Sequence, residues 1–456
     1  MKEGSGWRDG ERKDSERAIV NYTRKVLSLF KAYGIPETKA GIYGLCFLFI
    51  QRSMPDYWMV LRRAGKARSS DAAGIFQEAI GNLALPGECA PPKESGLEEF
   101  SEMVWKLTTL FEDISLNGEN VRMGVSDRLA EAAHRGYSTP LPVADLIVEL
   151  VGSLPWMTFY DPVCRTGSLL VRCARHIIQN YSEPYVSFRG TVSGDEDYCI
   201  TWLNLAVNGL EGGGIERFSD SADRVRSFPD VGEDQFDLVL LDLVEWPEYI
   251  RPEGGRFPYD EFKGYPARWD SLVMLVPGKA LAGRSYTDLR EWLVESDALE
   301  AIVRLPNGLF PSIRVDVDLL LICPEKPMET KGRILFVDAS GLPVDRGRKA
   351  LADEQARTIV NLYSTFHREG EIAAPGIPDL HCQVVSTREI ELRGVPAGSR
   401  GRGYDLDVSH YVVPEPEPVD LEAEFARLAG YKHRRGVLAR EMEEQMEWVL
   451  ERIRRE

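Results

Sequence analysis

The sequence has no long apolar run and few cysteines. Its longest apolar stretch covers residues 41–50, too short for the roughly 18 apolar residues of a membrane-spanning helix, and it predicts a buried helix instead. The highly charged start of the chain does not resemble a secretory signal peptide. Seven cysteines, an odd number, fit neither a zinc spacing nor a disulfide framework. We therefore expect a cytoplasmic protein with reduced thiols, no membrane association and no bound metal.

The sequence also has fewer basic than acidic residues. The 456 residues hold 55 lysines and arginines against 72 aspartates and glutamates, which gives a net charge of −17. This balance disfavours broad binding to nucleic acid, because contacts to phosphates supply most of the non-specific affinity. The first 68 residues are an exception, with 14 basic and 7 acidic side chains. We interpret this basic arm either as a solvated helix face or as a nucleic-acid contact.

Apolar periodicity changes along the chain. Residues from about 16 to about 125 repeat apolar side chains at three- and four-residue intervals, as helices do. From about residue 139, helical stretches alternate with short apolar runs, which indicates a parallel sheet with crossover helices. The expected strands cover 156–161, 189–196, 237–242, 270–277, 298–306, 317–324 and 333–340. The pattern predicts an α/β fold with a mostly parallel sheet, an N-terminal helical domain and a C-terminal helical tail.

The expected domains are a helical domain at 1–125, an α/β domain at 126–395 and a C-terminal segment at 396–456. Residues 247–268 are rich in proline, glycine and charge, and are expected to form a loop. The C-terminal segment carries apolar residues at helical spacing: Leu421, Phe425, Leu428, Leu438, Met442, Met446, Val449 and Ile453. This stripe predicts a helix that packs on its own domain or docks on a partner.

Acidic side chains follow three of the expected strands. Asp161 opens the segment DPVCRTGSLL (161–170), in which Gly167 would allow close approach of a ligand to the backbone. By itself this turn also fits a purely structural βαβ unit. Glu196 follows the next strand, where a carboxylate can accept hydrogen bonds from both ribose hydroxyls, and Asp220 follows a short third strand. Without a full G-x-G-x-x-G turn, these acids favour S-adenosylmethionine (SAM) over NAD.

Motifs along most of the chain resemble those of the modification (M) subunits of type I restriction–modification systems, which are N6-adenine DNA methyltransferases. STPLPVADLIVELV (138–151) resembles the family's Thr-Pro motif, and DPVCRTGSLL resembles its Asp-Pro-Ala-Cys-Gly-Thr-Gly-Gly motif. SGDEDYCITWLNLAVNGLEG (193–212) resembles the segment with the ribose-binding glutamate and an Asn-rich helix. The later resemblances cover 289–327, which includes LPNGLF, then 356–366 and finally 384–412, which includes SHYV and has an insertion at 393–402.

The resemblance implies a Rossmann-like methyltransferase fold, SAM as methyl donor and DNA as substrate. It also implies a specificity subunit docked partly through the C-terminal helix, together with self-association. The implied cofactor-binding residues are Thr139, Pro140, Asp161, Thr166, Gly167, Ser168, Glu196 and Asp220. Arg165 stands where the family has glycine. Its side chain would either crowd the methionine end of SAM or turn out into solvent.

The fourth strand departs from the family pattern. There the family has Asn-Pro-Pro-Phe or Asn-Pro-Pro-Tyr, whose oxygen acceptors hold the amino hydrogens of adenine while the aromatic ring stacks on the flipped base. The aligned residues here are Asp242, Leu243, Val244 and Glu245. Asp242 keeps an acceptor, and Trp246 would supply the ring only if the loop shifted by one residue. The resemblance thus implies Asp242 and Trp246 as catalytic residues.

Three functions fit these residues. The first is a DNA adenine methyltransferase subunit with an altered catalytic loop. The second is a catalytically inactive pseudo-methyltransferase that serves as a DNA-binding or scaffolding subunit in a defence-type assembly. The third is a methyltransferase redirected to another substrate, with Glu245 as an acid or base.

Overall fold

The computed structural model describes most of the chain up to Val412. The described residues are 9–69, 71–82, 97–134, 138–152, 154–210, 214–218, 234–244, 269–310, 314–345, 350–393, 404–412 and Met442. One compact unit ends at Val412 and a second begins at Val413. Asp220, Glu245, Trp246, the loop expected at 247–268 and all of the C-terminal stripe except Met442 lie outside the described residues. The domain limits at 125 and 395 stay a prediction.

The first six helices in the described part of the chain are α1 (Asp9–Ala32), α2 (Glu37–Ser53), α3 (Pro55–Lys66), α4 (Ala72–Gly81), α5 (Leu97–Leu116) and α6 (Glu119–Ala133). The prediction of a buried helix at 41–50 is confirmed, because every residue of α2 from Ala40 to Ile50 is buried. Close packing against α6 requires Gly41, where a Cβ atom would clash with backbone atoms of Leu129 and Ala133. The helices share one apolar core.

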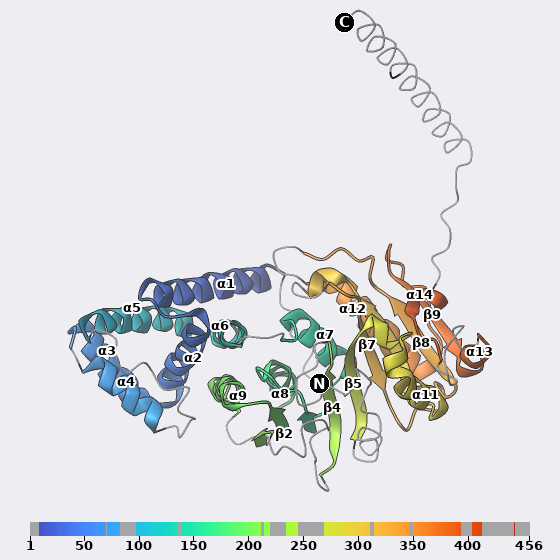
Figure 1. The fold of residues 1–456 in the computed structure, drawn as a ribbon, viewed down its shortest axis with the longest axis horizontal. Helices are drawn as coiled ribbons and strands as arrows, with labels where there is room; N and C mark the ends of the chain where they lie inside the picture. Colours follow the sequence, from blue (N-terminus) through green and yellow to red (C-terminus); the bar gives the residue numbers. More distant parts are fainter. Residues whose placement is uncertain are drawn as a thin grey trace, which may run out of the picture. The chain divides into compact units, whose positions relative to one another are not determined.

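Nine described strands form a single sheet in the order β3-β2-β1-β4-β5-β7-β6-β8-β9. Their bounds are β1 Trp156–Asp161, β2 Tyr185–Val192, β3 Gly214–Arg217, β4 Phe236–Asp242, β5 Trp269–Pro277, β6 Leu299–Leu305, β7 Val317–Ile322, β8 Arg333–Asp338 and β9 His381–Ser386. Among these strands five pairings are parallel and three are antiparallel. Figure 1 shows β4, β5 and β7 next to one another. The prediction of an α/β fold with a mostly parallel sheet is confirmed.

Successive residues of the central strands point to opposite faces, and both faces are buried. In β4, Leu238 and Leu240 belong to one apolar core, whereas Val239 and Leu241 belong to the other. The first core includes residues of α7 (Leu141–Val151), α8 (Ser168–Asn180) and α12 (Asp353–Glu369), and the second includes residues of α11 (Thr287–Glu295), α13 (Thr387–Arg393) and α14 (Val408–Tyr411). Because helices cover both faces of the sheet, the residues of the central strands are apolar on both sides, and the strands appear in the sequence as continuous apolar runs.

Helix α9 (Asp195–Val207) joins the helical layer to the sheet. Cys199, Ile200, Leu203, Ala206 and Val207 lie in the core that the N-terminal helices share. A second link is polar, because the Arg52 guanidinium donates to the carbonyl of Val207 at 2.5 Å. The two layers are therefore packed through the same helix that carries Glu196 in its first turn.

Several elements differ from the sequence-based expectations. Strand β2 covers Tyr185–Val192 rather than 189–196, because the chain leaves the ladder at Ser193 and α9 begins directly after Gly194. Helix α3 and strand β9 were not predicted. In β9 only one residue is buried, so it lacks the apolar run of the central strands.

The membrane and cysteine expectations can be compared with the described residues only. No described helix is both long and apolar enough to cross a membrane. Five cysteines have free thiols: Cys46, Cys164, Cys173, Cys323 and Cys382. Cys199 is disulfide-bonded, so the expectation that all thiols are reduced is wrong.

Candidate active site

The candidate site lies where the strand order reverses. Strand β1 pairs with β2 on one side and with β4 on the other, and the chain reaches β4 only after β2 and β3. In open α/β sheets, ligands bind in the crevice outside the carboxyl ends of the strands at such a switch point. Asp161 ends β1 and Asp242 ends β4. The structure therefore brings the two acids singled out in the sequence to the two sides of this crevice.

The turn between β1 and α8 has a tight backbone. Arg165 and Gly167 both have positive φ, at 49° and 73°. The Gly167 amide donates to the carbonyl of Cys164 at 2.8 Å, and the Thr201 hydroxyl donates to the carbonyl of Arg165. A Cβ atom on Gly167 would lie 3.1 Å from the Thr201 methyl group. Glycine is thus required by both the backbone conformation and the neighbouring helix α9.

Asp161 is fully buried at the start of this turn. One of its carboxylate oxygens accepts a hydrogen bond from the Val163 amide at 3.0 Å. Burial raises the pKa of Asp161 to about 7; the Val163 hydrogen bond and the Arg165 charge oppose this rise, and the Asp242 charge adds to it. A carboxyl group that titrates near neutral pH at a ligand crevice is typical of a functional site.

Asp242 has contacts on both carboxylate oxygens. The Thr139 hydroxyl donates to Oδ2 at 2.5 Å, and the Val244 amide donates to Oδ1 at 3.0 Å. Arg165 Nη1 lies 3.7 Å from the same Oδ2. The side chains of Arg165 and Asp242 are only 11% and 2% exposed. Of the two positions expected for Arg165, the structure therefore shows the inward one.

The residues after Asp242 turn into the protein. Leu243 is completely buried, and its amide donates to the carbonyl of Leu275 at 2.9 Å, which prolongs the contact between β4 and β5. Val244 is also buried, in the core on the other face of the sheet. Where the family resemblance places two prolines, this chain has two apolar side chains that pack in the interior.

The remaining predicted residues surround the turn. Thr139 and Pro140 precede α7, with Pro140 as its N-cap. The Thr166 hydroxyl lies 3.1 Å from that of Ser168 and 3.2 Å from that of Ser138. Glu196 is half-buried in the first turn of α9. The binding roles of these residues stay predictions, as do those of Asp220 and Trp246.

A buried polar network behind the turn was missed in the sequence. Asp127 of α6 is fully buried and accepts hydrogen bonds from Ser168 at 3.3 Å, Asn204 at 3.2 Å and Arg172 at 2.8 Å. Asn204 also donates to the carbonyl of Thr166 at 3.0 Å. The network holds the first turn of α8 against α6 and α9. The Asn-rich helix was a signal for Asn204, but no local pattern marks Asp127.

A second charged residue pair lies beside the turn. Asp197, in the first turn of α9, accepts a hydrogen bond from Ser193 at 2.6 Å and lies 2.9 Å from His134 Nδ1. Burial acts to raise the pKa of Asp197, but the His134 and Ser193 contacts together with the Arg165 charge lower it below its usual value. Within the described ranges, no group of three or more His, Cys, Asp or Glu residues could hold a metal ion.

Comparison with known proteins relates this geometry to a family. The model of the family described as "N-6 DNA Methylase" matches residues 127–243 and 271–418. The type I restriction enzyme MjaVIII methylase subunit of Methanocaldococcus jannaschii is 26% identical over 323 residues, which are 64% of this chain and 52% of that protein. The chain spans about half the length of the curated relatives it matches.

Solved structures share the fold. The methyltransferase subunit of a type I restriction–modification system from Streptococcus thermophilus has a TM-score of 0.59 and 15% identity, over 88% of this chain and 99% of that one. A chain from a structural study of complex assembly and conformational transition of the type I R-M system has a TM-score of 0.54 and 17% identity, over 97% and 98% of the two chains. Since the family model matches more than half of the residues and spans both sides of the crevice, this chain belongs to the N-6 DNA methylase family.

Proposed function

We propose that the chain is the modification subunit of a type I restriction–modification or related defence system, a DNA adenine N6-methyltransferase that uses SAM. The observation that carries this proposal is the convergence of Thr139, Asp161 and Asp242 at the switch point of a sheet that the N-6 DNA methylase model covers. The relatives that match are named as methylase subunits of type I restriction enzymes. In this role the protein acts in the cytoplasm, with its DNA target.

The residues of the turn fit the adenosyl part of SAM. Gly167 leaves the backbone open at a point where a side chain would meet Thr201. Glu196, at the carboxyl end of β2, is placed for a ribose hydroxyl pair. Thr139, Pro140, Asp161, Thr166, Ser168 and Asp220 complete the proposed binding set. When bound, SAM supplies a methyl group on a positively charged sulfur.

Asp242 is the proposed acceptor for the amino hydrogens of the target adenine. To act in this way, a carboxylate oxygen must become accessible to the base, because Asp242 is almost completely buried and already accepts hydrogen bonds from Thr139 and Val244. A flipped base also needs a stacking partner, and Trp246 is the proposed one. DNA binding and site choice would come from a specificity subunit, with the C-terminal segment as its proposed docking element and the basic N-terminal arm as a proposed DNA contact.

The inactive scaffold remains a second candidate on one specific observation. Both oxygens of Asp242 are engaged, and the carboxylate is almost completely buried. Leu243 and Val244 are anchored in the two cores rather than turned toward the crevice. This arrangement fits a protein that keeps the methyltransferase fold but has no accessible oxygen acceptor for the amino group of adenine.

Transfer of a labelled methyl group from SAM to DNA separates the two candidates. The test uses the full chain together with the subunits encoded beside it. The first candidate predicts label at adenine N6 and a loss of roughly 100-fold with Asp242→Ala, as when a group that stabilises the transition state is removed. The matched control is Asp288→Ala, an exposed carboxylate of α11. It should leave the rate unchanged.

Absence of label in the complete complex would contradict the first candidate and support the scaffold. The combined variant Asp242→Asn, Leu243→Pro, Val244→Pro and Glu245→Phe then tests the loop alone. Recovery of methylation in this variant would assign the inactivity to these four positions. Continued inactivity would place the defect elsewhere in the pocket.

A further inference from the structure

The turn between β1 and α8 is supported by side chains of helix α9. The Thr201 hydroxyl donates to the carbonyl of Arg165, and the Asn204 amide donates to the carbonyl of Thr166 at 3.0 Å. Arg165 and Gly167 have positive φ, and a backbone in this region keeps its conformation where its surroundings hold it. The two side chains of α9 are therefore external supports for the turn of the proposed SAM pocket.

Asn204 is held in one orientation. It is completely buried, and its amide nitrogen donates to Oδ1 of Asp127 at 3.2 Å as well as to the Thr166 carbonyl. Its oxygen accepts the Ser126 hydroxyl at 2.6 Å. A reversed amide would turn this oxygen toward the Asp127 carboxylate and the Thr166 carbonyl, neither of which donates. Asp127 therefore fixes the direction in which Asn204 donates to the turn.

Asp127 of α6 is completely buried and accepts from further side chains. The Ser168 hydroxyl donates to it at 3.3 Å and the Arg172 guanidinium at 2.8 Å. Burial raises the pKa of Asp127, and the Arg172 charge and the hydrogen bonds from Asn204 and Ser168 oppose this rise. Because Arg172 and the Asn204 nitrogen offer only donors, the ionised carboxylate fits these contacts.

These contacts connect a helix of the N-terminal layer to both ends of the segment 166–168. A side chain that holds a binding residue in its productive geometry raises the affinity for a ligand that it does not touch. We propose that Asp127 is a positioning residue of the SAM pocket, which acts through Asn204 and Ser168 on the turn between β1 and α8. This inference rests on the proposed function, because it concerns the same pocket.

Calorimetric titration of the purified full chain with SAM tests the inference. Asp127→Asn keeps the size of the side chain but leaves one oxygen acceptor where Asn204, Ser168 and Arg172 all donate. We expect this variant to bind SAM roughly tenfold more weakly than the native chain, or weaker still, which corresponds to about one hydrogen bond to a charged group.

Glu300→Gln is the matched control. Glu300 is another completely buried carboxylate with side-chain donors, Thr330 at 3.2 Å and Tyr363 at 2.8 Å. It lies on β6, which β5 and β7 separate from β4 at the crevice. The control variant should lose stability in urea unfolding, as Asp127→Asn should, but it should keep the native affinity for SAM. A purely structural role of Asp127 would give the same result as the control.

Two further variants test the path through Asn204. Asn204→Ala removes the donor to the Thr166 carbonyl, so it should also weaken SAM binding. The combined variant Asp127→Asn, Asn204→Asp restores a donor and an acceptor between the two positions but leaves no donor for the Thr166 carbonyl. It should bind SAM as weakly as Asp127→Asn. Thermal unfolding confirms the fold of each variant, and these two keep the test decisive if Asp127→Asn does not fold.

Four results would overturn the inference. Native SAM affinity in folded Asp127→Asn or Asn204→Ala would show that the support does not matter, while the proposed SAM pocket stands. An equal loss of affinity in Glu300→Gln would show a general effect of stability. Native affinity in the combined variant would show that the Thr166 carbonyl needs no donor. No binding of SAM by the native chain would overturn the pocket itself, and with it this inference.

Discussion

Two arginine–aspartate contacts lie at the carboxyl edge of the same sheet, and they are built differently. Arg304, near the end of β6, binds Asp318 through two hydrogen bonds, Nε to Oδ1 at 2.9 Å and Nη2 to Oδ2 at 3.2 Å. A third bond joins its Nη1 to Asp407 at 2.9 Å. The contact between Arg165 and Asp242 is longer, at 3.7 Å.

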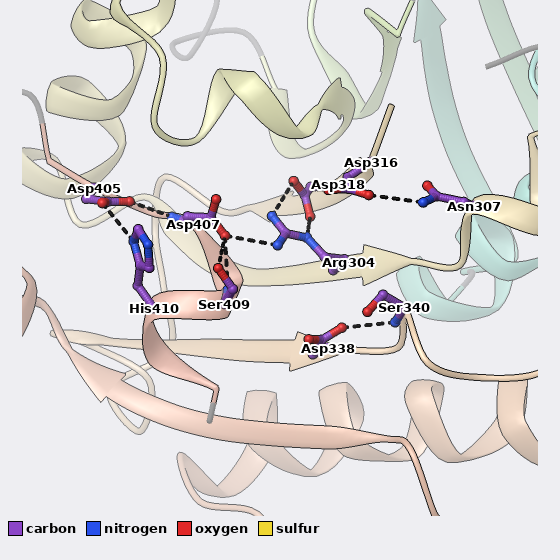
Figure 2. A network of polar contacts seen from close by, with 10 residues as sticks. All are labelled: Arg304, Asn307, Asp316, Asp318, Asp338, Ser340, Asp405, Asp407, Ser409 and His410. Carbon is purple, nitrogen blue, oxygen red and sulfur yellow. Dashed lines mark hydrogen bonds and ion pairs between the residues drawn. The ribbon is translucent and has the colours of Figure 1, made fainter. Parts of the chain in front are cut away.

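The residues around Arg304 also form more hydrogen bonds than those described for the Arg165–Asp242 pair. Figure 2 shows Asp407 between Arg304 and Ser409, whose amide and hydroxyl donate to the same carboxylate at 3.0 and 2.8 Å. Burial acts to raise the pKa of Asp407, but the Ser409 hydrogen bonds and the Arg304 charge lower it below its usual value. The neighbouring Asp405 accepts the amide of Asp407 at 2.9 Å and contacts His410 at 2.8 Å. Every group in this network has a fixed partner.

The comparison distinguishes a structural ion pair from a more weakly coupled one. Two parallel hydrogen bonds to one carboxylate give Arg304 both strength and a fixed orientation. The third bond, from Nη1 to Asp407, attaches the segment 404–412 to the sheet, because Asp407 belongs to that segment. The contact between Arg165 and Asp242 is a longer ion pair at a ligand crevice, so this pair should couple the two residues less strongly. Four tests compare the two regions of the sheet edge, from the largest expected effect to the smallest.

Arg304→Ala should destabilise the protein by about 3–5 kcal/mol, because it leaves the completely buried Asp318 without its cation. Urea unfolding of the full chain measures the effect. The matched control is Arg368→Ala, whose contact to Glu369 is also 3.7 Å long but whose side chain is 69% exposed. It should change the stability little, if at all. If Arg304→Ala lowered the free energy of unfolding as little as the control does, the structural role of Arg304 would be contradicted.

Asp161→Asn should remove part of the pH dependence of stability. The pKa of Asp161 is about 7 in the folded chain against an ordinary value of 3.8, so the folded state binds the proton more tightly. The free energy of unfolding of the native chain therefore falls as pH rises from about 4 to about 7. It stays at the lower value above pH 7. The variant should be more stable than the native chain by about 1–3 kcal/mol at pH 8, and much less so at pH 4.

Unfolding at a series of pH values measures this difference. Asp56→Asn, at an exposed position of α3, is the control. A difference between native chain and Asp161→Asn that does not change with pH would contradict the assignment. The same result would also weaken the case that the crevice holds a carboxyl group tuned by burial.

Gly167→Ala should cost about 1–2 kcal/mol, because alanine is strained at positive φ and its Cβ would lie 3.1 Å from the Thr201 methyl group. Gly74→Ala, in helix α4 with no atom near the added Cβ, should instead stabilise the chain by about 0.5–1 kcal/mol. Changes in melting temperature of opposite sign for the two variants would support the conclusion that the turn at Gly167 is tight. A stabilising Gly167→Ala would argue that the turn relaxes easily.

The smallest expected effect is the coupling between Arg165 and Asp242. A double-mutant cycle with Arg165→Met and Asp242→Asn should give no more than about 1 kcal/mol, because Asp242 retains two other donors. The same cycle with Arg304→Met and Asp318→Asn should give clearly more. Equal coupling in the two cycles would remove the distinction between a structural and a more weakly coupled pair.

Much of the fold could be predicted from the sequence. Apolar runs and helical periodicity gave β1 at 156–161 as observed, and they located β4 with an aspartate at its end. The order of the strands could not be read from the chain. Strand β7 lies between β5 and β6 and is antiparallel to both, and no local pattern states which strands become neighbours.

Less of the site could be predicted. The acids at strand ends followed from the alternation of strands and helices, but the inward course of Arg165 depends on a carboxylate 77 positions further along the chain. Asp127 was missed for the same reason, since its partners lie on α8 and α9. The burial of Leu243 and Val244 could not be predicted either. An apolar residue that follows a strand can pack in the interior or face the ligand crevice, and the sequence does not distinguish the two positions.

Helix α9 has a mechanical consequence. Its apolar side belongs to the core of the N-terminal helices, while its first turn holds Glu196 and its Thr201 supports the turn of Arg165. A contact that shifts the helical layer would therefore also act on the turn between β1 and α8. Removal of that layer would expose the apolar residues that α9 contributes to its core, so a chain without the N-terminal helices should also lose the support of this turn.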